Sequence, residues 1–232
     1  MAKLKIYHSS HIRKLFVNLH TTITHIEQRM KKATSLVSLL ICILGILTAQ
    51  VTYAQPSRKD YKKISNVTYY GAVFEGTRIL KARQTATEYK QFFDDINAYY
   101  QENSEAISSG LKKYLKLTLD GVDVSYANTA NARISELELF TYKNHSTPGT
   151  YQDLQKKLEK LRIPKKDGYG MVLFSYLIDY KEAEFKYDVV FFDLKTMRII
   201  AFGDSESERL NKGTYKEFLE SVPDAINEYP FR

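Results

Sequence analysis

Three acidic residues at alternate positions are the first candidates for chemistry. Asp204, Glu206 and Glu208 are separated by single serines in the run DSESE. Loops rich in carboxylate oxygens can hold Ca²⁺, which takes about six to eight oxygen ligands. The spacing of an EF-hand is absent, and a charge run in a turn is commonly only solvated. The three residues therefore form a weak candidate metal site.

Other carboxylates suggest a hydrolase as the alternative function. Adjacent acids on a helix point about 100° apart, so a pair such as Asp94 and Asp95 cannot easily share a substrate. Hydrolysis by two carboxylates needs acids that converge across a cleft. Asp179, Asp188 and Asp193 could converge in this way, with or without a bound cation, although their spacing alone does not show it.

Nucleophilic catalysis has little support. His145 is the only histidine after residue 54, and it lies in the polar stretch KNHS, which we expect to be a loop without a nucleophile motif nearby. Ser109 and Lys112 match the S-x-x-K pattern, but its companion motifs are absent. We therefore predict no catalytic residue and expect no cofactor.

Tyrosines offer a different kind of site. The chain has 18 tyrosines and no tryptophan. Tyrosine combines a large contact area with a polar tip and is enriched at recognition surfaces, whereas tyrosines on amphipathic helices belong to the core. The predicted binding residues are the tyrosines on expected strands whose outer face is open: Tyr69, Tyr70, Tyr176, Tyr180 and Tyr187.

Residues 30–54 have the three parts of a secretory signal peptide. Two lysines follow Met30, residues 36–47 are almost entirely apolar, and small side chains occupy the third-last and last positions before Gln55. This pattern predicts cleavage after Ala54 and export to the periplasm or the medium.

Two other fates of this segment are weaker. A membrane-spanning helix needs about 20 apolar residues, and the apolar run is shorter. A lipid anchor at Cys42 would need a small residue where Ile41 stands. Residues 1–29 are interpreted as a start site assigned too far upstream, or else as a long basic extension of the signal.

Removing the leader changes the charge and the cysteine content. The full chain has 34 basic and 27 acidic residues; residues 1–54 hold seven of the basic and one of the acidic, which leaves 27 against 26 and a net charge of +1. The basic character that would suggest nucleic acid therefore belongs to the leader, and no nucleic-acid partner is expected. The only cysteine is Cys42, so disulfides and thiolate sites are also excluded.

The remaining residues predict one domain, 66–232, after a flexible lead-in at 55–65. Capping boxes at Thr85 and Thr214 predict two helix starts, and further helices are expected from Ser104, near 134–140 and from Thr150. Strands are expected at 66–75, 119–126, 171–178, 186–194 and 197–202. Gly71 inside the first strand predicts a bulge or a close backbone approach.

These elements predict an α+β fold: an antiparallel β-sheet with helices packed on one face, in which a C-terminal strand meander is followed by a helix. No membrane span is expected after signal cleavage.

Three segments carry a resemblance to a known group. These are Tyr69-Tyr70-Gly71, the helix containing Phe92 to Asn97, and the strand Val189 to Asp193. They resemble small exported proteins of Bacteroidetes with no assigned activity, over about residues 64–231. The resemblance implies export and an α+β fold, and it implies no catalytic residue.

The function expected from the sequence is therefore a non-catalytic periplasmic or secreted binding or assembly module. An exposed tyrosine-rich sheet face, or an edge strand, would dock a protein or glycan partner. The carboxylate-based hydrolase remains the alternative.

Overall fold

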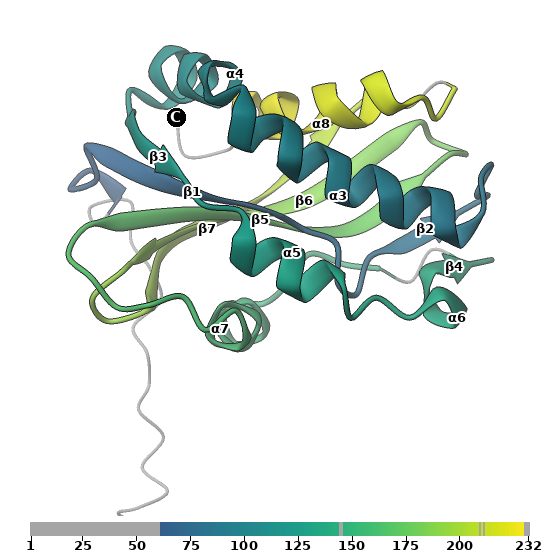
Figure 1. Cartoon of the computed structure of the whole chain (residues 1–232), viewed down its shortest axis with the longest axis horizontal. Coiled ribbons are helices and arrows are strands. Elements are labelled where there is room, and N and C mark those ends of the chain that lie inside the picture. Colours follow the sequence, from purple (N-terminus) through teal and green to yellow (C-terminus); the bar gives the residue numbers. More distant parts are fainter. Residues whose placement is uncertain (1–60, 144–145, 209, 211, 230–232) are drawn as a thin grey trace, which may run out of the picture. The chain divides into compact units, whose positions relative to one another are not determined.

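A computed structural model describes residues 61–143, 146–208, 210 and 212–229. Strands and helices alternate along much of this part of the chain (Figure 1). The elements are β1 (Asn66–Val73), β2 (Arg78–Leu80), α3 (Ala86–Glu102), α4 (Ser104–Gly110), the π-helical turn η1 (Leu111–Leu115), β3 (Thr118–Val122), α5 (Ser125–Asn131), α6 (Glu136–Leu139), β4 (Phe140–Thr141), α7 (Tyr151–Lys160), β5 (Tyr169–Asp179), β6 (Glu184–Asp193), β7 (Arg198–Ser207) and α8 (Tyr215–Asn227).

The strands form one mixed sheet centred on β5. On one side β5 pairs with β6, and β6 pairs with β7, both antiparallel. On the other side β5 has two parallel partners in succession, with β1 along its first half and β2 along its last residues. β3 lies parallel beyond β1, and β4 lies parallel beyond β2. Residues 74–77 interrupt what would otherwise be one long strand.

The predicted antiparallel sheet with helices on one face is therefore wrong. The order β3-β1-β5-β2-β4 is parallel throughout, and the arrangement is α/β. The error has a physical reason. Helices separate β2 from β3, β3 from β4, and β4 from β5, and crossovers of this kind bring strands into parallel pairing. The antiparallel run β5, β6, β7 followed by α8 is present as predicted.

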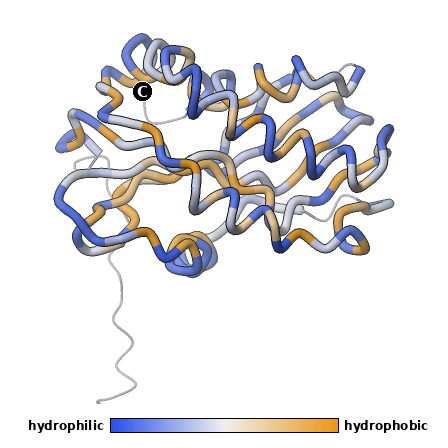
Figure 2. The backbone as a smooth tube through the Cα atoms, in the orientation of Figure 1, coloured by the Kyte–Doolittle hydropathy of each residue, from blue (hydrophilic) through white to orange (hydrophobic). Residues whose placement is uncertain are grey.

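Helices cover both faces of the sheet (Figure 1). One core lies between the sheet and helices α3 and α8, and it includes Met171 and Leu173. A second core lies between the sheet and helices α5 and α7, and it includes Val172 and Phe174. Successive residues of β5 thus face opposite cores, which explains why its sequence is a continuous apolar run, drawn mostly in orange in Figure 2.

The prediction of a bulge or close approach at Gly71 is confirmed. Its φ is +92°, and the pairing of β1 with β5 shifts register between Tyr69 and Ala72. A Cβ atom at this position would lie 3.0 Å from the Ala127 Cβ and 3.0 Å from the Asn97 Oδ1. Glycine is therefore required both by the backbone conformation and by the space.

The predicted helix starts are confirmed as well. Thr85 and Glu88 form a capping box at α3, and Thr214 and Glu217 form one at α8. The Thr150 hydroxyl accepts from the Asp153 N–H at the start of α7. Each cap satisfies backbone donors that the first helical turn leaves without partners.

At the end of the expected lead-in, Tyr61 and Ile64 are buried in the core under α3 and α8. The Tyr61 ring lies 5.5 Å from the Phe191 ring, measured between centroids. The leader, Cys42 and His145 lie outside the described residues. None of the described helices combines the length and the apolar character that crossing a membrane requires.

Candidate functional site

The five predicted binding tyrosines do not form an exposed face. Tyr69 and Tyr187 are 0% exposed, Tyr70 is 2% exposed, and Tyr176 and Tyr180 are each 6% exposed. The expectation of an open sheet face is corrected by where these side chains lie: Tyr69, Tyr180 and Tyr187 belong to the core under α3 and α8. Tyr70 belongs to the core under α5 and α7.

These tyrosines instead pack and bond inside the domain. The Tyr187 hydroxyl lies 2.8 Å from the Ser221 Oγ, Tyr176 donates to Asp204 Oδ1 at 2.7 Å, and Tyr180 donates to Gln84 Oε1 at 3.0 Å. Tyr69 packs edge-on against Tyr100, and Tyr70 packs against Phe192. Burial raises the pKa of Tyr69 and Tyr187, so both phenols stay neutral.

The acidic run belongs mostly to a strand and not to a loop. Asp204 and Glu206 lie within β7, and each already has a partner. Asp204 accepts from the Tyr176 hydroxyl, and Glu206 pairs with Lys186 at 3.1 Å. Within the described part of the chain, no three His, Cys, Asp or Glu side chains come together in a way that could hold a metal ion.

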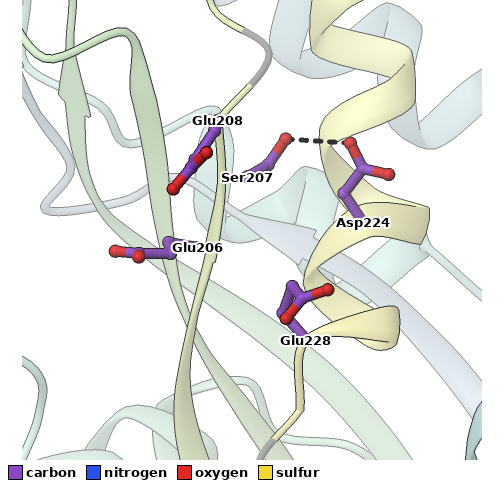
Figure 3. A pocket seen from close by; sticks show the side chains of 5 residues that line it. All are labelled: Glu206, Ser207, Glu208, Asp224 and Glu228. Atoms are coloured by element: carbon purple, nitrogen blue, oxygen red, sulfur yellow. Dashed lines mark hydrogen bonds between the residues drawn. The ribbon is translucent and has the colours of Figure 1, made fainter.

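Figure 3 shows a different acidic hollow beside β7. Its volume is about 380 Å³, and its carboxylates come from Glu206 and Glu208 on one side and from Asp224 and Glu228 on the α8 side. Ser207 donates to Asp224 Oδ2 at 3.1 Å, so that carboxylate is turned toward the strand. The acids come from two walls and do not converge on one point.

The carboxylates considered for hydrolysis are placed apart. Asp179 accepts from the Lys181 N–H in the turn after β5, and Asp193 accepts from the Thr196 N–H in the turn after β6. Each is a turn residue. Asp188 lies at neither turn, because it sits in the middle of β6 opposite Phe174 of β5.

Among the described carboxyl groups with a shifted pKa, Asp188 has the largest shift. It is 1% exposed, and the Gly149 N–H donates to both of its oxygens, at 3.1 and 3.0 Å. Burial raises the pKa of Asp188 to about 7, the Gly149 N–H and Lys157 oppose that shift, and Asp204 adds to it. With so little exposure, the carboxyl group is held inside the domain by the residue that precedes the N-cap of α7.

A concave site of another kind lies between α5 and α7, at the carboxyl end of β1. We call it the α5–α7 groove. Its outer lobe has a volume of about 620 Å³, within the range of small-molecule sites. One wall carries Tyr126, Thr129 and Arg133, the floor is Glu75, and the other wall carries Lys160, Leu161 and Arg162.

An inner lobe of about 200 Å³ continues the groove. It shares Glu75, Lys160 and Leu161 with the outer lobe and adds Val73, Gly76, Lys157 and Phe174. The Lys157 ammonium lies 5.7 Å from the centre of the Phe174 ring. The walls of the inner lobe are thus more apolar, with ammonium groups at its rim.

The groove concentrates positive charge around one ion pair. Arg133 donates from Nε and Nη2 to the two Glu75 oxygens at 3.0 and 2.8 Å. This bond lowers the pKa of Glu75, with further lowering by Lys160 and Lys157. The lobes together hold Arg133, Lys157, Lys160 and Arg162 against Glu75, a local excess of three positive charges.

Arg162 is held in a conformation that favours glycine. Its φ is +56°, immediately after the last turn of α7. Left-handed backbone costs a non-glycine residue roughly 1–2 kcal/mol, and glycine is common at this position of a helix end. An arginine there presents a cation to the groove despite that cost.

The groove could not be predicted from the expected elements, because a strand was expected at 119–126 and no helix was expected where α5 (Ser125–Asn131) lies. The spacing of Tyr126, Thr129 and Arg133, three and four residues apart, is the signal that could have revealed one polar face of a helix. On the α7 side, Lys160 and Leu161 follow Lys157 by three and four residues, with Lys160 the last residue of α7 and Leu161 its C-cap. The sequence does not show that the α5 residues and the α7 residues face each other near the end of β1.

Exposed apolar side chains gather elsewhere, at the sheet edge formed by β4. Leu137 is 96% exposed, Tyr142 94% and Phe140 40%, and all three lie on α6, β4 or the residue that follows.

Comparison of the chain with protein-family models, with curated proteins and with solved structures gave no match, so the function is inferred from the geometry above.

Proposed function

We propose that the protein acts after export as a non-catalytic binding module, and that the α5–α7 groove holds an anionic ligand. The observation that carries the proposal is the excess of three positive charges around a concave site in a domain whose expected net charge is only +1. Cations that gather in a hollow attract and retain anions better than the same charges scattered over a surface.

Two of these cations, Lys160 and Arg162, are exposed, and neither forms a salt bridge with an acid among the described residues. Arg133 uses two N–H groups to bind Glu75, and a guanidinium has five. The groove therefore has several donors available for a ligand.

The geometry favours binding over hydrolysis. Glu75 is the only carboxylate in the groove lining, and Arg133 holds both of its oxygens. A hydrolase that uses two carboxylates needs two acids facing the same substrate. Asp179, Asp188 and Asp193 lie at three separate places outside the groove.

Citrate, a small trivalent anion, provides the test. We expect a citrate titration followed by amide nuclear magnetic resonance to shift resonances around Arg133, Lys160 and Arg162. The double variant Lys160→Glu/Arg162→Glu should abolish those shifts. The matched control is Lys112→Glu/Lys113→Glu, which changes the net charge equally at exposed positions of η1. Equal responses of the two variants would contradict the proposal.

Export rests on residues 30–54. N-terminal sequencing of the protein from its native host should give Gln55 as the first residue. Recovery of chains that begin at Met1 or Met30 would contradict signal cleavage and would leave the groove proposal to stand without export.

A further inference from the structure

We infer that the ligand of the α5–α7 groove is an acidic saccharide, a sugar chain that carries carboxylate or sulfate groups. This inference rests on the proposed function and names the class of its ligand.

The first argument is that a carboxylate, Glu75, lies among the positively charged groups of the groove. Glu75 is ionised at neutral pH, because Arg133, Lys160 and Lys157 all lower its pKa. A compact inorganic anion placed on the groove floor would be repelled by this carboxylate. A ligand with hydroxyl groups can donate to Glu75 while its anionic group meets Lys160 and Arg162, which satisfies both signs of charge.

The second argument concerns the α5 wall. Tyr126 is half-buried, packs its ring against Tyr70 and lines the outer lobe. The Thr129 hydroxyl donates to the Ser125 carbonyl at 2.8 Å, so its oxygen keeps lone pairs for a donor from the ligand. A flat aromatic surface beside hydroxyl and carboxylate acceptors suits a sugar ring, which has C–H faces and O–H edges.

The third argument is length. The two lobes share Glu75, Lys160 and Leu161 and are therefore adjacent, so a chain-like ligand could contact both. Lys157 supplies another cation beside the apolar walls of the inner lobe. Successive cations along two adjacent lobes fit a chain with a repeated negative charge better than a single small anion.

Isothermal titration of the purified protein at low ionic strength compares four probes: trigalacturonate, a sulfated trisaccharide, neutral maltotriose and citrate. We expect one or both acidic trisaccharides to bind more tightly than citrate, and maltotriose to bind at least about 10-fold more weakly. The two acidic probes distinguish the source of the charge. The variant Lys160→Ala/Arg162→Ala should weaken acidic-sugar binding about 10- to 100-fold, and Lys112→Ala/Lys113→Ala should not change it.

Two conservative variants separate a sugar from a simple anion. Thr129→Val removes a hydroxyl with little change of shape, and it should weaken acidic-sugar binding while leaving citrate unchanged. Glu75→Gln removes the negative charge from the floor and keeps an acceptor for Arg133. It should strengthen citrate binding and weaken or leave unchanged the binding of the acidic sugar.

The outcomes separate the two proposals. If citrate binds as tightly as the acidic sugars and Glu75→Gln strengthens all of them, the saccharide inference fails and the anion-binding function stands. If maltotriose matches the acidic trisaccharides, or if no anionic probe binds, both fail.

Discussion

The side-chain amides of Asn97 and Asn131 donate to the same backbone carbonyl, that of Ala72, at 3.0 and 3.2 Å. Asn97 comes from α3 and Asn131 from α5. Their amide oxygens accept from the Ala72 and Phe74 N–H groups, at 2.8 and 2.7 Å. The bulge at Gly71 interrupts the pairing of β1 with β5, and the two asparagines supply the bonds that the bulge disrupts.

Loss of either amide should therefore destabilise the whole domain. We expect Asn97→Ala and Asn131→Ala each to lower the free energy of unfolding by about 2–4 kcal/mol, because each leaves a buried backbone N–H without an acceptor. Urea denaturation measures the change. The exposed Asn103, whose amide bonds to the Tyr99 carbonyl, is the control, and Asn103→Ala should cost less than about 1 kcal/mol. A cost equal to this control would show that the amides are not needed.

Gly71 and Gly121 form a matched pair on neighbouring strands. Gly71→Ala combines a positive φ with Cβ contacts of 3.0 Å, and we expect a loss of about 2–4 kcal/mol in unfolding free energy. An added Cβ at Gly121 would meet nothing within 4 Å, so Gly121→Ala should be neutral or slightly stabilising. Similar thermal midpoints for the two variants would contradict the close approach at Gly71.

Asp188 should make stability fall as the pH rises. Its pKa is raised to about 7 in the folded protein by burial, against about 3.9 in the unfolded chain. The stability that Asp188 contributes is therefore fully present below about pH 4, declines between about pH 4 and pH 7, and is lost above pH 7, a total of roughly 4 kcal/mol. In Asp188→Asn the amide oxygen still accepts from Gly149, so the variant should gain stability over the wild type at pH 8 and only about a third as much at pH 5.

The control for this experiment is Asp167→Asn. The Asp167 side chain is 91% exposed and pairs only with the exposed Lys195, so this variant should keep the wild-type dependence of stability on pH. Urea midpoints measured between pH 5 and pH 8 give the comparison. If Asp188→Asn retains the same slope as the wild type, another group is responsible for it.

Arg162 and Lys116 allow stability to be separated from binding. Both have positive φ at the end of a helix, at +56° and +59°, and glycine at either position should raise the free energy of unfolding by about 1 kcal/mol. Arg162→Gly should also weaken anion binding, because it removes a cation from the groove. Lys116→Gly should leave binding unchanged. Equal anion affinity in the two variants would exclude Arg162 from the site.

Local signals in the sequence were sufficient for individual elements. The capping boxes at Thr85 and Thr214 and the glycine at 71 act within a few residues, so they could be recognised from the chain alone. The pairing direction of β1, β3 and β5 depends on which face each connecting helix takes. That choice is made by long-range packing, which explains why the sheet was predicted antiparallel and one-sided.

The candidate site was harder to predict for the same reason. The tyrosines at 69 and 187 look like ligand residues when their side of the strand is assumed to be open, but that side faces α3 and α8, so both belong to the core. The groove unites Glu75, Tyr126 and Lys160, which lie on three segments far apart in the chain. No short-range sequence pattern shows that these three segments line one groove, although the helical spacing within each wall can be read from the sequence.

The break between β1 and β2 divides the sheet into a large block and a small one. Only three residues of β2 and two of β4 build the small block, and Thr77 bridges the break by donating to the Ser175 carbonyl at 3.0 Å. A break of this kind, which we call the seam, permits local unfolding of the small block alone. The backbone amides of β2 and β4 would then exchange with solvent while those of the large block stay protected. Because Glu75 and Gly76 lie at the seam and line the groove, an occupant would slow that exchange and couple the two blocks.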